Sequence, residues 1–277
     1  MMHKNNTKLI LLTALISISN ISLAEKAPFE SSYEPLPSTN TIFRNANIYD
    51  GEGNEFSETD LLIKDGKIIA MGTDLPGSPE FIEVDASGKW ITPGIIDIHS
   101  HMGVYSAPSV SSSSDGNEST SPITADVWAE HSIWTQDPQF ALALKGGVTT
   151  FHVLPGSANL IGGRGVTAKN LQRNTINSMK FPNAPHTLKM ACGENPKRVY
   201  GNRKQAPSTR MGNIAGYRKA WIEAESYLSR LDEYESKSDE AKEIGYKPKR
   251  DLELETLAGV LRGEILVHNH CYRAGEM

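Results

Sequence analysis

Apolar and polar positions alternate, with the period of a half-buried β-strand, in parts of residues 41–94. Three segments there have this pattern, and each contains Gly, Asp-Gly or Ser-Gly turn residues: TIFRNANIYDG, DLLIKDGKIIAMG and FIEVDASGKWITPG. Asp65-Gly66 stands between two apolar runs, which is a strong signal for a β-hairpin. We therefore expect a small β-sheet segment here. Residues 25–40, which are rich in Pro, Ser and Glu, are expected to form an extended linker.

After residue 91, short strand-like runs are interspersed with longer segments of helical spacing. Apolar positions predict helices over residues 125–145, with a break at Asp137-Pro138, over 217–244 and over 251–262. The second of these has a charged face toward solvent. Asp251 is a typical N-cap for the last of these, and Gly263 is a typical stop. The predicted strands lie in the segments IIDIHSH, VTTFHVLPG, HTLKMA and EILVHNHCYR.

The segment TPGIIDIHSHM ends in two histidines that are separated by one residue. Side chains alternate faces along a strand, so His99 and His101 point the same way, with Asp97 behind them. Two imidazoles on one face at the end of a strand make half of a site for zinc or a similar divalent metal. His268 and His270 also share a face in the last predicted strand, and their spacing alone does not choose between them.

The first 24 residues have the pattern of a secretory signal peptide. A short positive start precedes the apolar residues 9–18, and Ser22-Leu23-Ala24 fits a small-x-small cleavage site. We therefore predict cleavage before Glu25 and export to the periplasm or the medium. The apolar run is too short to span a bilayer comfortably, so no membrane attachment is expected after cleavage.

Composition excludes few classes of function. A formal net charge of -5 leaves no basic field for nucleic acid, which we do not expect as a partner. Cys192 and Cys271 could pair in an exported chain, or could be small buried thiols at strand ends, and we leave both interpretations open. The glycine-rich segment GSANLIGGRG could cradle an anion through its backbone N–H groups, but it lacks the spacing of a P-loop.

Four segments together resemble an exported, imidazolonepropionase-like branch of the amidohydrolase superfamily: PGIIDIHSH, GGVTTFHVLPGSANLIGG, KMACGENPKRVYG and LVHNHCYR. The resemblance implies an α/β fold, a (β/α)8 TIM-type barrel preceded by a small β-sandwich domain. Residues 41–91 would be the N-terminal β-sandwich segment, and residues 92–277 the N-terminal portion of the barrel. It also implies one or two divalent metal ions, with zinc expected. The reaction would be hydrolysis of an amide, cyclic amide or other C–N bond by a metal-activated hydroxide.

The same resemblance assigns roles to particular residues. His99 and His101 would be metal ligands, together with His270, because HCYRAGEM resembles the segment that the metal histidine opens after the fifth barrel strand. His268 would then be an alternative ligand or a contact to the substrate. The expected partner is a small-molecule or short-peptide substrate, and a homo-oligomer is also compatible with the family. His152, alone in its strand, would line the substrate site or have a structural role.

Two-metal members of the superfamily need a bridging anion, and two residues compete for this role. Lys189 lies mid-strand in LKMA, which resembles the strand of the carboxylated lysine. Glu194 resembles the glutamate of the deacetylase branch. We prefer Glu194 because it falls at the C-terminal end of a strand, where barrel sites lie.

The chain departs from the family pattern at its end. It stops at Met277, just after what resembles the fifth strand, so the histidine that follows the sixth strand is not found. The aspartate after the eighth strand, which handles the proton, is not found either, and the catalytic acid or base is left unassigned. We expect a truncated product, or a non-catalytic remnant that still binds metal.

Overall fold

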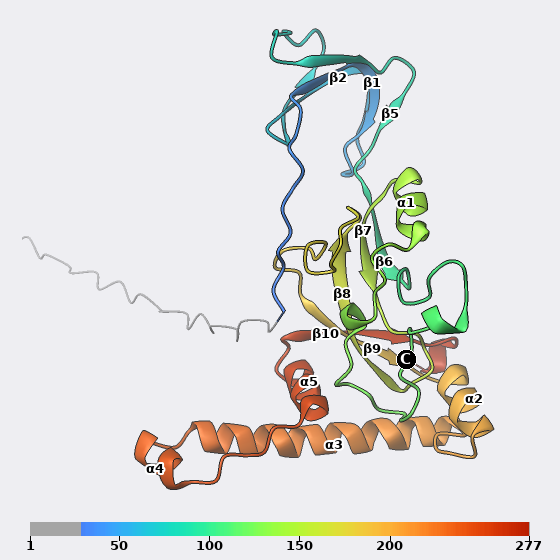
Figure 1. Ribbon diagram of the computed structural model, residues 1–277, viewed down its shortest axis with the longest axis vertical. Helices are drawn as coiled ribbons and strands as arrows, with labels where there is room; N and C mark the ends of the chain where they lie inside the picture. The colour runs from blue at the N-terminus through green and yellow to red at the C-terminus, as the bar shows by residue number, and fades with distance from the viewer. Residues whose placement is uncertain (1–28, 277) are drawn as a thin grey trace, which may run out of the picture. The chain divides into compact units, whose positions relative to one another are not determined.

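The computed structural model describes residues 29–276 (Figure 1). The predicted signal peptide, residues 1–24, lies outside the described residues, so its cleavage and the export of the chain stay predictions. All elements described below belong to one unit, residues 31–277. Between residues 29 and 276, no helix is long and apolar enough to cross a membrane.

Residues 41–91 form a five-stranded sheet in the order β3-β2-β1-β4, with β5 also paired to β1. Its strands are β1 (Thr41–Tyr49), β2 (Glu55–Lys64), β3 (Lys67–Gly72), β4 (Ile82–Asp85) and β5 (Trp90–Ile91). The predicted hairpin joins β2 to β3, since Lys64 pairs with Lys67 across the turn. Asp65 and Gly66 both have positive φ, 51° and 72°, as a two-residue type I′ turn requires.

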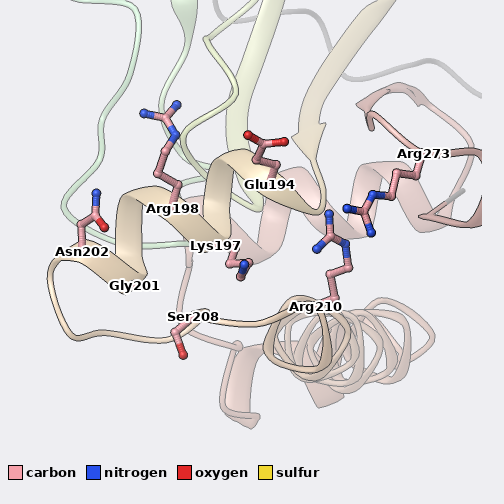
Figure 2. Close-up of a pocket in the computed structure, with 8 residues that line it drawn as sticks. All are labelled: Glu194, Lys197, Arg198, Gly201, Asn202, Ser208, Arg210 and Arg273. Atoms are coloured by element: carbon pink, nitrogen blue, oxygen red, sulfur yellow. The ribbon is translucent and has the colours of Figure 1, made fainter.

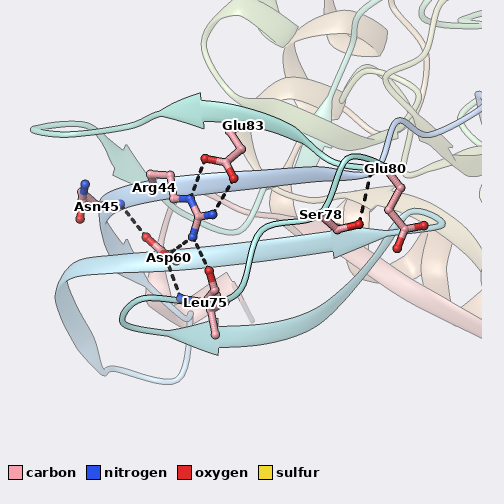
Figure 3. Close-up of polar contacts among 7 residues, drawn as sticks. All are labelled: Arg44, Asn45, Asp60, Leu75, Ser78, Glu80 and Glu83. Carbon is pink, nitrogen blue, oxygen red and sulfur yellow. Dashed lines mark hydrogen bonds and ion pairs between the residues drawn. The ribbon is translucent and has the colours of Figure 1, made fainter.

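A charged cluster on Arg44 ties this sheet together (Figure 3). Arg44 Nη1 donates to Asp60 Oδ2 at 2.7 Å and to the Leu75 carbonyl at 2.6 Å, and Nη2 donates to Glu83 Oε1 at 2.7 Å. Burial would raise the pKa of Asp60, but the hydrogen bonds from Arg44 and from the Asn45 and Leu75 amides outweigh it and lower that pKa. The cluster thus links strands β1, β2 and β4 and the loop after β3.

A second sheet holds the histidine-bearing strands in the order β10-β9-β8-β7-β6. They are β6 (Ile95–Ser100), β7 (Val148–Val153), β8 (Ile161–Lys169), β9 (His186–Ala191) and β10 (Ile265–His270). The pairs β6–β7 and β9–β10 are parallel, and β8 is antiparallel to both of its neighbours. The sheet is curled like part of a barrel, so the expected α/β class is confirmed. The boundaries of the domains stay a prediction.

Strand β8 was not among the strands predicted from the sequence, and its first half lies in the glycine-rich segment GSANLIGGRG. Glycines let neighbouring groups approach this strand closely. A Cβ on Gly163 (φ +107°) would lie 2.4 Å from the Val127 carbonyl oxygen, and one on Gly165 would lie 2.8 Å from His152 Nε2. The glycines therefore allow close packing of a strand.

The helices are α1 (Pro138–Lys145), α2 (Glu194–Asn202), α3 (Arg210–Glu235), α4 (Asp239–Ile244) and α5 (Leu252–Leu261), with short 3-10 turns at Ser111–Ser113, Ala129–His131 and Ala274–Glu276. The helix predicted over residues 217–244 is in fact two helices, α3 and α4. Thr209 caps α3 by accepting from the Gly212 amide, and Ser238 caps α4. A core of buried apolar residues joins α3 and α5 to strands β8 to β10, with Leu188, Ala224 and Leu257 fully buried.

The question of the two cysteines is answered by the structure. Cys192 and Cys271 form a disulfide, with 5.1 Å between their Cα atoms. Each follows the last residue of a strand by one position, Cys192 after β9 and Cys271 after β10. The bond therefore connects the carboxyl ends of two neighbouring strands.

The outer strands of the second sheet, β6 and β10, carry exposed apolar side chains. Ile96 and Ile98 of β6 are 61% and 68% exposed, and Leu266 of β10 is 51% exposed. Among the described residues, each of these strands has a strand neighbour on one side only. Barrel strands are normally covered on both faces, and open apolar edges favour pairing with another chain. We therefore predict that the 277-residue polypeptide, expressed alone, self-associates.

Sedimentation velocity measures this association directly, since a monomer has a mass of 30.3 kDa. Ile98→Lys, which places a charge on the open strand, should shift the distribution toward the monomer. A concentration-independent monomer for the unsubstituted polypeptide would contradict the prediction.

Candidate functional site

Two strands bring histidines, and a third brings a lysine, to one small pocket, which we call the histidine pocket. It has a volume of about 160 Å³ and is lined by His99, Lys189, His268, Asn269, His270 and Cys271. His99 comes from β6, Lys189 from β9, and the other histidines from β10, where His268 is in register with Lys189. The ring centroids of His99 and His101 are 5.2 Å apart, and those of His99 and His270 are 5.9 Å apart. The structure thus brings together the histidines that the sequence pattern selected.

Lys189 lies in the middle of these imidazoles. Its side chain is 1% exposed, and its Nζ is 3.1 Å from His99 Nε2. Burial disfavours the charged amine and lowers the pKa of Lys189 to about 8. A large part of the lysine population is therefore neutral at mildly basic pH.

The histidines of the pocket are held in the neutral form. Burial is the main cause, and it lowers the pKa of His99 to about 4, with the nearby Lys189 as the next contribution. The pKa values of His268 and His270 are lowered by the same two causes, again with burial first. Burial also lowers the pKa of His101, against a hydrogen bond that raises it. Neutral imidazole is the form that binds a metal ion.

The loop after β7 orients two of these rings. His101 Nδ1 donates to the Leu154 carbonyl at 2.8 Å, which leaves Nε2 with its lone pair. His270 Nδ1 is hydrogen-bonded to the Ser157 hydroxyl. Asn159, 1% exposed, anchors the loop by donating to the Glu118 and Ser121 carbonyls. Ser157 belongs to the segment GSANLIGGRG, considered above as an anion cradle, and this segment therefore restrains the ring of His270.

His152 lies behind the histidine pocket. Its ring stacks on that of His268 at 5.0 Å between centroids, and the side chain is 5% exposed. Both ring nitrogens are engaged, Nδ1 with Thr167 Oγ1 at 2.9 Å and Nε2 with Thr187 Oγ1 at 2.8 Å. Both roles expected above for His152, structural or substrate-lining, stay predictions.

Glu194 lies in a different pocket from the histidines. It is the first residue of α2, is exposed, and lines a cavity of about 580 Å³ (Figure 2). The other lining residues are Lys197, Arg198, Gly201, Asn202, Ser208, Arg210 and Arg273. We call this cavity the basic pocket. Sequence reasoning missed it because its cations come from two helices and a third segment, although the Lys197-Arg198 pair is a visible signal.

The histidine pocket offers the donor chemistry of a divalent metal site, with neutral imidazoles from two strands beside a buried lysine. Within residues 29–276, no three His, Cys, Asp or Glu side chains are arranged so that they could hold an ion by themselves. Lys189, which is not of these types, occupies the space next to His99 Nε2. An anionic group at Lys189 would complete the donor set.

A comparison of the chain with family models found no match. Amidohydrolase tasK of Hapsidospora irregularis is 35% identical over 262 residues, a match that covers 88% of this chain and 26% of tasK. A crystal structure of an amidohydrolase from Thermotoga maritima has a TM-score of 0.76 and 36% identity, and the match covers 85% of this chain and 59% of that one.

A shorter match joins this chain to a dihydroorotase of Lactobacillus helveticus, 39% identical over 61 residues, which cover 22% of this chain and 13% of the relative. The chain thus spans about a quarter of tasK and less than two thirds of the Thermotoga structure. Similarity over most of this chain, in sequence and in fold, shows its family. The chain belongs to the amidohydrolase superfamily.

Proposed function

We propose that the protein is a metal-dependent hydrolase of amide, cyclic amide or other C–N bonds. One observation carries the proposal. His99, His101 and His270, at the ends of β6 and β10, lie around Lys189, which is buried inside β9. The relatives support the reaction class, because their names include amidohydrolase, dihydroorotase and L-hydantoinase. The nature of the scissile bond beyond this class rests on the resemblance alone.

His99, His101 and His270 would hold the metal, and zinc is the ion that suits their imidazoles best. When bound, a divalent ion polarises a carbonyl group and lowers the pKa of water to near neutrality. We propose Lys189, in place of our first preference Glu194, as the source of the bridging anion, since Lys189 lies beside His99 and Glu194 lines the basic pocket. A neutral amine is the form of lysine that can be carboxylated, and burial favours that form.

The other residues of the site keep its geometry. The Leu154 carbonyl fixes the tautomer of His101, and the Ser157 hydroxyl restrains the ring of His270. The disulfide Cys192–Cys271 connects the strand that carries Lys189 to the strand that carries His270. These contacts would hold the donors in place before an ion binds, which reduces the cost of assembling the site.

Zinc and manganese titrations of the 277-residue chain, followed by assays on dipeptides, cyclic imides and N-acyl amino acids, test the proposal. We expect saturable binding of one or two ions per chain and turnover in one substrate class, abolished by a chelator. Stoichiometric binding without turnover would favour the alternative, a protein that binds metal without catalysis. Absence of saturable binding would refute both.

A further inference from the structure

The basic pocket is built on one face of α2. Glu194, Lys197, Arg198, Gly201 and Asn202 follow the i, i+3, i+4, i+7, i+8 spacing of a single helix face. The opposite wall consists of Ser208, Arg210 at the start of α3, and Arg273 in the segment after β10. Figure 2 shows the side chains of Arg210 and Arg273 pointing toward each other. The cavity of about 580 Å³ is within the range of small-molecule sites.

Positive charge is in excess in this pocket. Four of the lining side chains are cationic, and one, Glu194, is anionic. Glu276 neutralises Arg210, because its carboxylate pairs with Arg210 Nε, and that hydrogen bond lowers the pKa of Glu276. The same carboxylate accepts from the Tyr272 and Arg273 amides at 3.3 Å, so it is fully engaged.

Three of the cations have no partner of opposite charge within the described residues, namely Lys197, Arg198 and Arg273. Arg198 donates only to a neutral group, Asn195 Oδ1 at 3.2 Å. Like charges that converge on one cavity repel one another, and an anion between them removes that repulsion. Guanidinium groups also bind carboxylate and phosphate oxygens in a planar, two-point geometry.

The basic pocket neighbours the histidine pocket along two chain segments. Arg273 follows His270 by three residues, so their Cα atoms are at most about 11 Å apart. On the other side, Glu194 follows the disulfide residue Cys192 by two positions, and Cys271 lines the histidine pocket. A small molecule that reaches from one pocket to the other is therefore sterically reasonable.

We propose that the basic pocket binds the anionic group, a carboxylate or a phosphate, of a small molecule whose other end reaches the histidine pocket. The proposal rests on the proposed function in so far as that molecule is the substrate. Lys197, Arg198 and Arg273 form the binding wall, with the Ser208 hydroxyl and the Asn202 amide as neutral donors. Glu194 lowers the affinity and limits the site to ligands with strong anionic groups.

Calorimetric titration of the metal-free 277-residue chain with succinate and with inorganic phosphate tests the binding wall without catalysis. We expect saturable binding that weakens as salt is raised, because exposed charges are screened. Lys197→Ala and Arg273→Ala should each weaken it about fivefold, the upper range for an exposed ion pair. Glu194→Gln should strengthen it. Lys247→Ala, which removes an exposed positive charge outside the pocket, is the matched control and should change nothing.

Binding that is absent, or that is insensitive to both Lys197→Ala and Arg273→Ala, would overturn the proposal. All of these residues are exposed or half-buried, so the substitutions should leave the fold intact, which circular dichroism checks. For the substrate, an N-acyl amino acid is compared with its carboxamide, which lacks the carboxylate. Arg273→Ala should lower kcat/KM for the acid about fivefold and leave the amide unchanged. If no substrate turns over, the proposed function fails, while the titration still decides on the anion site.

Discussion

Replacement of Lys189 by methionine is expected to weaken zinc binding by about 100-fold or more, whereas Glu194→Gln should leave it unchanged. Lys189 is buried beside His99, with its Nζ 3.1 Å from His99 Nε2. Glu194 is exposed and lines the basic pocket. Methionine has a similar volume and no charge, so the change removes the amine and its anionic derivative and preserves packing. Competition with a zinc chelator of known affinity measures the loss.

Two further variants make the result specific. His99→Ala combined with His101→Ala should reduce zinc binding at least as far as Lys189→Met does, because it removes two of the three imidazole donors. Lys180→Met, also a buried lysine but paired with Glu130 at 2.7 Å and outside the histidine pocket, controls for loss of a buried amine. Zinc binding that is kept in Lys189→Met and lost in Glu194→Gln would restore our first preference and would contradict the assignment made from the geometry.

The sequence pattern was sufficient to predict those features that depend only on the spacing of nearby residues. The two-residue period of a strand put His99 and His101 on one face, and the Asp65-Gly66 turn defined a hairpin, because both are determined by residues close together in the chain. Strand β10 was predicted on the same ground. In each case the structure differs from the expectation by only a few residues at the ends of the element.

The choice between Lys189 and Glu194 could not be made from spacing. It depends on where the carboxyl end of β9 lies relative to β6 and β10, which long-range packing determines. Lys189 is in register with His268, and Glu194 comes after the turn at Gly193 that starts α2. A rule that places barrel sites at strand ends favours the later residue, although here the residue inside the strand faces the histidines.

Features that bring together distant parts of the sequence could not be predicted either, because they also depend on long-range packing. The basic pocket gathers residues from α2, α3 and the segment after β10, which are up to 79 positions apart in the sequence (Glu194 to Arg273). The pairing of Cys192 with Cys271 depends on β9 and β10 lying side by side. Strand β8 depends on neighbours that come close only because glycines leave space for them.

Acidification is expected to destabilise the chain by about 3 kcal/mol through His152 alone. Burial lowers the pKa of His152 from 6.5 to about 4, and positively charged neighbours, first His268 when protonated, act in the same direction. The folded chain therefore keeps this ring neutral at a pH where the unfolded chain binds a proton. Stability due to the neutral ring is complete above pH 6.5 and is lost as the pH falls from 6.5 through 4. A shift of one pKa unit corresponds to about 1.4 kcal/mol.

Urea unfolding of dilute protein at pH 7.5, 5.5 and 4, for the unsubstituted chain and for His152→Gln, isolates this contribution from that of other histidines. Glutamine does not titrate and can keep a hydrogen bond to Thr167 or Thr187. We expect His152→Gln to be less stable than the unsubstituted chain at pH 7.5, since it loses one of two buried hydrogen bonds and the stacking on His268. The difference should shrink or reverse toward pH 4, because only the unsubstituted chain must then hold a buried histidine neutral. Parallel loss of stability in both proteins over this range would show that His152 does not govern the acid sensitivity.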